Sequence, residues 1–457
     1  MRLLRQLFLL LLLSTVAAAQ QAPAAAQEAA EEHHVTAAEA KALFRSLDDI
    51  LRFASEHSGL PVLHPVKKKM ASREEVAKYI EARMKEQGNG ERFDRSALSL
   101  KKLGLLPRDF NLRQYMLGLY KEQVEGWYDA KNKTAYLLDW VAPEAQKPVM
   151  AHELVHALQD QSFDLEKWLK VGKDSKDDTA EMILDEQRTA REAIIEGQAM
   201  IVLFDYQLAP AGQSVESAPA LVDSMKSSML DEGSTPMYAE APIYLREAML
   251  FPYTYGMEFV RSVLVKRGKQ TAFAGVFEHP PLDTREILEP ATYLVAEPQT
   301  QLKVVALEKV LGSEWRREDF SGLGAIDLRV LLRQWSGSEV AAKLTPAWRG
   351  GYYMTFSHKK SAKDAPVSLA LVLSFASEAA ADQFADVYRS SLAQRYKSVQ
   401  AVPSPGQSSA FQWTTDEGTV RLFIDGSTVI AAESFTAEEA AKIHAALVPT
   451  TEVPVAQ

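Results

Sequence analysis

The sequence contains no cysteine among its 457 residues. This absence excludes disulfide cross-links and attachment of a lipid through a cysteine thiol. A chain of this length can bury cores large enough to fold without such cross-links. Its hydrophobic content of 47% and charged content of 25% are typical of a soluble globular protein.

Long apolar runs are also scarce. The clearest one, at residues 7–13, follows Arg2 and Arg5, and three alanines precede Gln20. This pattern predicts a signal peptide at residues 1–19, because the apolar run is too short to anchor a protein in a bilayer. No later segment is long enough to span a membrane. We therefore expect an exported bacterial protein, either periplasmic or secreted.

Positive charge is in short supply, with 51 Lys and Arg against 61 Asp and Glu and a formal net charge of −10. Removal of the signal peptide would leave 49 basic residues and a charge of −12. A nucleic-acid partner is disfavoured, because no basic region supplies contacts to phosphates. We interpret the lysine run at residues 67–69 as a solvated loop.

The most informative stretch is the H-E-x-x-H pattern formed by His152, Glu153 and His156. Histidines four residues apart lie on one face of a helix, so both imidazoles can bind one metal ion. Apolar neighbours predict a buried helix, in which a metal would satisfy the polar groups. The alternative is a surface helix that carries two histidines by chance.

Zinc would require a third protein ligand and an open fourth position for water. Glu192 and Glu196 share one face of an otherwise apolar predicted helix, which favours ligation by one of them. We predict Glu196 as the ligand, beside Gly197, where the absence of a side chain would let the two helices approach closely. We assign supporting positions to Glu192, a possible ion-pair partner of Arg188 or Arg191, and to Asp160. The alternative is that both glutamates are solvated.

The fold class predicted is α+β, with a mainly helical first domain and a smaller α+β second one. Helices are expected at residues 37–57, 72–85, 111–124, 147–161 and 178–208, with a further helical region at 218–268. A hairpin at 125–138 precedes the H-E-x-x-H helix, and it either binds extended substrate or only covers the core.

The last 150 residues change character and predict a small α+β sandwich without a catalytic constellation. Strands are expected at residues 368–375, 410–413, 419–424 and 428–433, and helices at 304–311, 378–396 and 436–447. The predicted organisation is a signal peptide (1–19), a disordered spacer (20–35), a metallopeptidase domain (36–300), an accessory domain (301–450) and a tail (451–457).

Three segments together, at residues 122–129, 152–164 and 196–199, resemble gluzincin-type metallopeptidases. More closely, they resemble a group of exported bacterial proteins with HELxHALQDQ and EGxA motifs. The resemblance spans about residues 100–300 and implies a zincin-like fold. It implies one Zn²⁺ per chain held by His152, His156 and Glu196, with Glu153 as general base.

Residues 251–256 and 280–290 match the same group, and Glu289 stands where we expect a histidine in relatives. If that histidine stabilises the oxyanion, its absence bears on full activity. Tyr253 and Tyr255 are candidate donors to the transition state. The methionines of residues 225–257 are expected to fill a core more than to line a cleft.

The leading hypothesis is a zinc-dependent peptidase that hydrolyses peptides or proteins with water activated by Glu153. One alternative is a catalytically inactive envelope protein, for binding or assembly, in which zinc is structural. The other is a structural protein without metal. Zinc is inferred from ligand type alone, because the same groups can hold other divalent ions.

Overall fold

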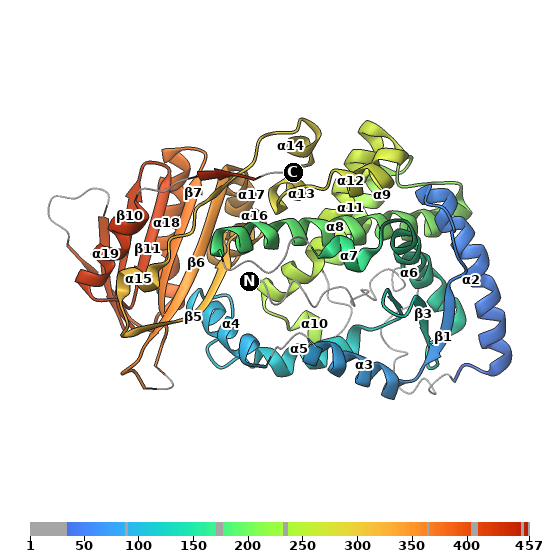
Figure 1. Cartoon of the computed structure of the whole chain (residues 1–457), viewed down its shortest axis with the longest axis horizontal. Helices are drawn as coiled ribbons and strands as arrows, with labels where there is room; N and C mark the ends of the chain where they lie inside the picture. Colours follow the sequence, from blue (N-terminus) through green and yellow to red (C-terminus); the bar gives the residue numbers. More distant parts are fainter. Residues whose placement is uncertain are drawn as a thin grey trace.

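The computed structural model describes residues 34–86, 90–170, 177–231, 236–362, 365–403, 410–448 and 452–455. The predicted signal peptide and nearly all of the predicted spacer lie outside these ranges. The described chain is α+β, with a helical N-terminal region and a sheet-rich C-terminal region, as the sequence predicted (Figure 1).

Helices dominate the described residues up to 294. They are α2 (Ala37–Ser58), α3 (Arg73–Glu86), α4 (Gly90–Lys102), α5 (Leu112–Gln123), α6 (Pro143–Phe163), α7 (Leu165–Leu169), α8 (Asp178–Leu208), α9 (Pro219–Asp231), α10 (Pro236–Ala239), α11 (Ile243–Arg267), α12 (Val276–Glu278), α13 (Thr284–Leu288) and α14 (Pro290–Leu294). The caps explain several starts, since Thr36 forms a capping box with Glu39 before α2 and Asn111 caps α5. In Figure 1, α8 runs along the long axis of the molecule, from the sheet-rich side toward α2.

A three-stranded sheet lies beside these helices, in the order β1 (Lys67–Ala71), β3 (Thr134–Leu138), β2 (Trp127–Asp129). The predicted hairpin is β2 and β3, which pair antiparallel. The predicted solvated loop at residues 67–69 is wrong, because these lysines begin β1, which pairs parallel with β3. The prediction failed because lysines are common on edge strands, where they point to solvent and discourage further pairing.

The C-terminal region is built on a seven-stranded antiparallel sheet. Its strands, in spatial order, are β5 (Trp315–Gly322), β6 (Trp348–His358), β7 (Ser368–Phe375), β11 (Thr428–Glu433), β10 (Gly418–Asp425), β9 (Ala410–Thr415) and β8 (Val399–Val402). Its helices are α15 (Leu307–Leu311), α16 (Ala325–Ser336), α17 (Ser338–Leu344), α18 (Glu378–Arg395) and α19 (Ala437–Leu447).

The two faces of this sheet face two different cores, as the alternation along β7 shows. Leu369, Leu371 and Leu373 belong to the main core of the molecule, which α16 and α18 share. Ala370 and Val372 belong to a second core beneath α15 and α19. Successive side chains of a strand point to opposite faces, so a strand buried on both sides reads as a continuous apolar run.

The predicted boundary at residue 300 does not separate two cores. The main core is continuous from Leu43 on α2 to Ala431 on β11. Within the predicted tail (451–457), residues 452–454 form β12 (Glu452–Pro454), which pairs antiparallel with β4 (Thr300–Leu302). This pairing joins segments about 150 residues apart in sequence, which no local pattern predicts.

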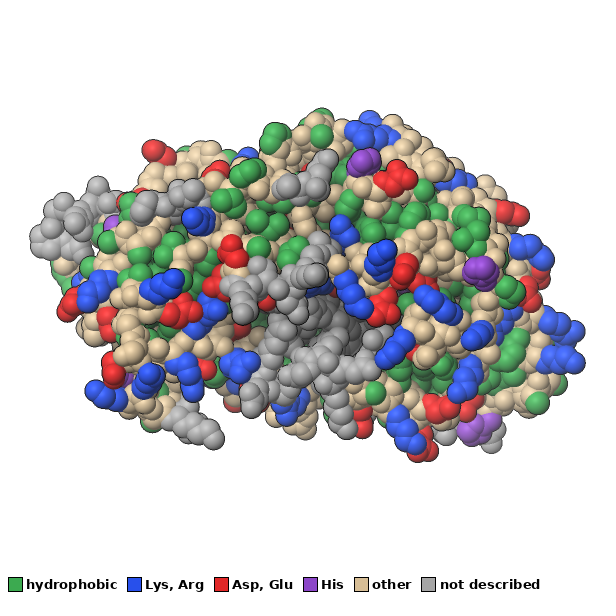
Figure 2. All heavy atoms as spheres, in the orientation of Figure 1, with side chains coloured by type: hydrophobic (Ala, Val, Ile, Leu, Met, Phe, Trp, Pro, Cys, Tyr) green, Lys and Arg blue, Asp and Glu red, His purple; other side chains and the backbone are tan. Residues whose placement is uncertain are grey.

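None of the helices in the described ranges is both long and apolar enough to cross a membrane. On the face drawn in Figure 2, basic and acidic side chains are interspersed over both regions.

Candidate metal centre

The H-E-x-x-H segment lies in the middle of α6, and every residue from Val149 to Asp160 is buried. The helix begins earlier than predicted, because Pro143 occupies its first turn and Pro148 lies inside it. α6 packs against α2 on one side and α8 on another, so its polar residues are enclosed by other helices. This burial excludes the alternative of a surface helix.

Glu196 lies on α8, whose bounds match the prediction, and its carboxylate faces both histidines. Its Oε2 atom is 3.0 Å from Nε2 of His152 and 3.5 Å from Nε2 of His156. Each of the three residues offers a ligand atom within 4.8 Å of the other two, and all three are buried. The alternative that both Glu192 and Glu196 are solvated is therefore excluded, since both are buried. The group could hold a metal ion.

The electrostatics of the three groups are coupled. Burial raises the pKa of Glu196, but the adjoining His156 and His152 outweigh it and lower the pKa to about 2. Burial lowers the pKa of His152 to about 4 despite the hydrogen bond with Glu196. For His156, burial is outweighed by the charge of Glu196, and the pKa rises to about 9. The carboxylate thus remains ionised, as a metal ligand must be.

A pair of glutamines orients His156. Gln159 donates through Nε2 to the carbonyl of Ile195 and to Oε1 of Gln198, so its own Oε1 faces Nδ1 of His156 at 2.9 Å. Gln198 in turn donates to the carbonyl of Ala272. Because Nδ1 of His156 must donate to Gln159, its Nε2 is the nitrogen available to a metal.

The sequence reasoning did not identify Gln159 or Gln198 as part of the site. Both lie inside the quoted motifs, and both are fully buried amides on helices lined with apolar residues. A buried amide needs hydrogen-bond partners, so their positions were a usable signal.

His152 is enclosed more tightly and has a different environment. Its ring packs edge-on to His156, with centroids 4.8 Å apart, and lies near the ring of Tyr253 at 6.1 Å. Its Nδ1 is buried without a hydrogen-bond partner among the described residues. Nε2 is the nitrogen that faces Glu196 and donates to its carboxylate; with the proton moved to Nδ1, the Nε2 lone pair would be available to a metal ion between the two side chains.

Glu153 is 5% exposed and accepts a hydrogen bond from the backbone N–H of Tyr128, on β2, at 2.6 Å. Burial raises the pKa of Glu153 to about 7, although His156 and the Tyr128 amide oppose this rise. A carboxyl group with a pKa near neutrality can accept and return a proton at physiological pH.

Asp160 holds the side chain of Tyr128, the residue whose backbone N–H contacts Glu153. It accepts a hydrogen bond from the hydroxyl of Tyr128 at 2.7 Å and pairs with Lys133 at the same distance. It also accepts the backbone N–H of Leu165. Its contacts therefore fix the position of β2 against α6, which refines the supporting role predicted for it.

The two candidate tyrosines on α11 have different surroundings. Tyr253 is 2% exposed and is the one whose ring lies beside His152. The ring of Tyr255 lies beneath the guanidinium of Arg329 on α16. Residues two apart on a helix project to nearly opposite sides, so both cannot face one centre.

Glu192 is buried one turn before Glu196 and lines a small cavity with Tyr244 and Phe251. Of its predicted partners, Arg188 pairs with Asp185 and Arg191 donates to the carbonyl of Trp168. Its supporting role therefore stays a prediction.

Glu289 lies between α13 and α14, and its carboxylate is 3.8 Å from Nε of Arg285. Burial raises the pKa of Glu289, against the charges of Arg285 and Arg349. An acidic side chain beside two arginines occupies the place where the resemblance leads us to expect a histidine.

Gly197 has the close approach that the sequence predicted, but to a different helix. A Cβ atom on Gly197 would lie 2.3 Å from the backbone of Gly256 on α11, and one on Gly256 would lie 2.1 Å from the carbonyl oxygen of Ala193. The expectation that Gly197 brings α6 and α8 together is wrong, because Gly197 faces α11. Two glycines permit backbone contact next to Glu196.

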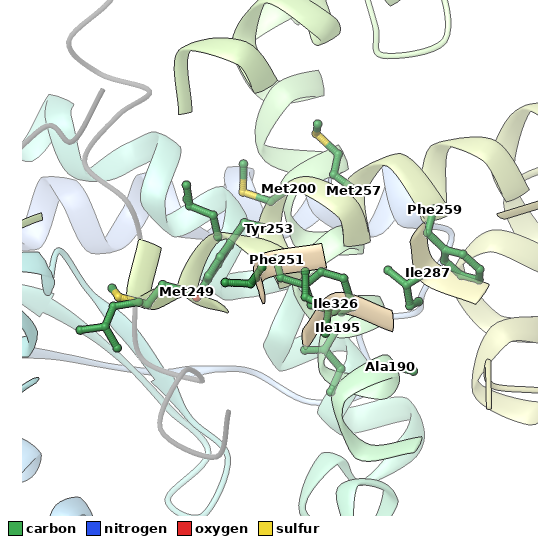
Figure 3. Packing of buried hydrophobic residues seen from close by; sticks show 14 of the residues in the cluster. Ala190, Ile195, Met200, Met249, Phe251, Tyr253, Met257, Phe259, Ile287 and Ile326 are labelled. Atoms are coloured by element: carbon green, nitrogen blue, oxygen red, sulfur yellow. The ribbon is translucent and has the colours of Figure 1, made fainter. Parts of the chain in front are cut away.

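Around this crossing, methionines fill space. Met249 and Met257 are each 1% exposed, which confirms that they belong to the core. Figure 3 shows Ile195 from α8 packed with Phe251 and Tyr253 from α11.

The comparison with known protein families finds a match in the C-terminal region, away from the candidate metal centre. A family model described as a domain of unknown function (DUF8575) matches residues 312–444. No curated protein and no solved structure matches the chain. The matched segment contains all seven strands of the C-terminal sheet and lies outside the His152, His156 and Glu196 group.

Proposed function

We propose that this chain is an exported, zinc-dependent metallopeptidase of the gluzincin type. The observation that carries the proposal is the convergence of His152, His156 and Glu196 from two buried helices, with Glu153 on the same helix as the histidines. Two imidazoles and one carboxylate are a ligand set found in zinc peptidases.

The spacing of the donor atoms supports zinc. Ligands 2.0–2.2 Å from a tetrahedral zinc lie roughly 3.3 Å apart. The two separations between histidine nitrogens and the Glu196 oxygen are 3.0 and 3.5 Å. All three donor atoms lie within 4.8 Å of one another, so the group could hold an ion of this size, and Gln159 fixes His156 in the tautomer that ligation needs.

Zinc, when bound, would polarise the scissile carbonyl and make the attacking water more acidic. Glu153 would accept a proton from that water and deliver it to the leaving amine, a role that suits its raised pKa. Tyr128 would hold the Glu153 carboxylate through its backbone N–H until the proton moves.

The test replaces Glu153 by Gln, which keeps the shape of the side chain and removes the base. Purified without an affinity tag, parent and variant should each contain about one zinc per chain, while the variant loses at least about 10²-fold in peptide hydrolysis. Glu258→Gln, on α11, is a matched control and should keep activity. Equal hydrolysis by Glu153→Gln and the parent would exclude the mechanism.

One observation favours a second function. Because Glu289 occupies the place of an expected histidine, the centre could be a structural zinc site in a binding or assembly protein of the envelope. One zinc per chain without hydrolysis of any member of a broad peptide library would support this second function over the first.

A further inference from the structure

A groove lies between the N-terminal helices and the C-terminal sheet region. It consists of two adjoining cavities of about 630 and 610 Å³. Four residues line both of them, so the cavities form one continuous groove: Lys101, Arg108, Gln394 and Arg395. The walls come from the end of α4, the segment after it, the end of α18 and the turn between β9 and β10.

The groove is rich in positive charge, in a chain whose net charge is −10. Arg108 and Lys102 both pair with Glu417, at 2.7 and 2.8 Å. Lys101 and Lys397 also line the groove; neither forms a close ion pair with a described residue, although the charge of Lys397 helps to lower the pKa of the neighbouring Asp416. These two cations are therefore available to an anionic group.

The acidic groups in the walls leave this positive charge largely uncompensated. Asp416 accepts hydrogen bonds from the backbone N–H groups of Lys397 and Ser398, so its carboxylate stabilises the local backbone. Glu240 and Arg246, one acidic and one basic residue, both line the second cavity. Positive charge therefore exceeds negative charge along the groove.

Arg395 also lines both cavities, but its charge is already neutralised. Its side chain is 1% exposed and its Nη2 donates to Glu433 at 2.6 Å and to the carbonyl of Lys102 at 2.9 Å. Its Nη1 is buried and has no hydrogen-bond partner among the described residues. The guanidinium also lies over the rings of Trp335, Tyr388 and Tyr396, so Arg395 is held within the wall and the more exposed cations are left to contact a ligand.

The size and the mixed walls indicate what kind of anion fits. Each cavity is far larger than a single inorganic anion and falls in the range of organic ligand sites, roughly 300–1,000 Å³. Leu98, Phe110 and Val367 add apolar surface to the walls. Alternating apolar and cationic contacts suit a peptide that carries both apolar and acidic side chains.

We propose that this groove binds an acidic segment of a polypeptide, with its carboxylates beside Lys101 and Lys397. The binding does not depend on hydrolysis at the metal centre, since the groove has its own walls and charges. If the centre is a peptidase, the groove supplies a contact for acidic substrates away from the scissile bond.

The test measures binding of fluorescein-labelled octapeptides that alternate Leu with Glu or Leu with Gln. The full chain carries Glu153→Gln, so that any hydrolysis is removed and binding is measured alone. Fluorescence anisotropy should show the Glu peptide binding about tenfold more tightly than the Gln peptide at about 50 mM salt, with most of this preference lost at about 300 mM.

The matched variants reverse two charges each. Lys101→Glu with Lys397→Glu should weaken binding of the Glu peptide by about tenfold or more. Lys303→Glu with Lys309→Glu, two exposed lysines that do not line the groove, should change it less than about twofold. Unchanged melting temperatures would establish that both charge-reversed variants are folded. If charge reversal disturbs the fold, the milder pair Lys101→Gln with Lys397→Gln replaces it, and this pair should weaken binding of the Glu peptide by an intermediate amount.

Two results would overturn the proposal. The first is equal affinity for the Glu and Gln peptides. The second is displacement of the Glu peptide by inorganic phosphate that binds more tightly than the peptide itself, which would make the groove a site for small anions.

Discussion

The backbone N–H of Tyr128 donates a 2.6 Å hydrogen bond to the carboxylate of Glu153, so an edge strand holds the candidate base. The tyrosine hydroxyl bonds to Asp160 two turns further along α6. One residue of β2 therefore contacts α6 at two points. The position of Glu153 depends on strand β2 as well as on its own helix.

This relationship predicts that Tyr128→Phe weakens the site without removing the metal. Loss of the hydroxyl bond to Asp160 should lower the free energy of unfolding by about 1–2 kcal/mol, because that bond has a charged acceptor. Peptide hydrolysis should fall several-fold while zinc content stays constant. The measurements are thermal unfolding, metal analysis and a hydrolysis assay.

Tyr136→Phe is the matched control on the neighbouring strand. Tyr136 stacks on Trp127 at 4.4 Å, and its hydroxyl has no hydrogen bond with a described residue. The same substitution there should change stability by less than about 0.5 kcal/mol. If the two variants behave alike, the Tyr128 hydroxyl does not support the site.

The glutamine beside His156 gives a second prediction. Gln159→Leu removes the acceptor that fixes the ring, and zinc affinity should fall by about 10- to 100-fold. Gln161→Leu, two residues later, is the control, since the amide of Gln161 bonds to the backbone of residues 63–64. Competition with a zinc-binding dye measures the zinc affinity of both variants. Equal affinities would show that Gln159 does not support zinc binding by His156.

The crossing of α8 and α11 predicts a large effect from one methyl group. In Gly256→Ala, the new Cβ would lie 2.1 Å from the carbonyl oxygen of Ala193, so the helices must separate. The free energy of unfolding should fall by about 3 kcal/mol or more, and zinc affinity should fall with it because Glu196 lies on the displaced helix.

Gly275→Ala controls for the loss of a glycine. Its added Cβ would meet the methyl group of Thr271 at 3.4 Å, an ordinary contact, so stability should change by less than about 1 kcal/mol. Chemical denaturation followed by circular dichroism measures both variants. A Gly256→Ala protein as stable as the Gly275→Ala protein would contradict the backbone contact.

Much of the helical framework could be predicted from the sequence, because its signals are local. The bounds of α8 match the expectation, and the capping boxes at Thr36 and Thr436 begin helices where predicted. The three candidate ligands also converge as expected, since buried polar side chains on apolar helices need partners.

The errors concern contacts between distant segments. The parallel pairing of Lys67 with Thr134 and the pairing of β4 with β12 have no local signal, because an edge strand can be charged and a short terminal strand resembles a tail. Gly197 was recognised as a point of close approach, but only the fold shows that Gly256 is its partner.

Asp283 predicts how stability depends on pH. It is 1% exposed, and burial, together with the charges of Glu186 and Glu286, raises the pKa of Asp283 from 3.8 to about 7. The folded state therefore keeps a proton that the unfolded state releases, so this group's contribution to stability falls as pH rises from about 4 to about 7.

Asp283→Asn should remove this dependence, because the amide keeps the oxygen that accepts the N–H of Glu286 and carries no charge. Relative to the parent, the variant should gain on the order of 3 kcal/mol between pH 4 and pH 8. Asp416→Asn is the control: backbone N–H groups outweigh burial and lower the pKa of Asp416, so it titrates below this pH range and its substitution should leave the pH dependence nearly unchanged. Urea denaturation across this range tests both, and a constant difference between Asp283→Asn and the parent would refute the assignment.

The central claim is that two histidines from α6 and one glutamate from α8 hold a single zinc ion. Anomalous diffraction at the zinc edge, from crystals of protein purified without chelators or affinity tag, tests it most directly. The account predicts one strong peak about 2.0–2.2 Å from Nε2 of His152, Nε2 of His156 and a carboxylate oxygen of Glu196. No peak among these side chains after incubation with zinc, or a peak that Glu196 does not reach, would contradict it.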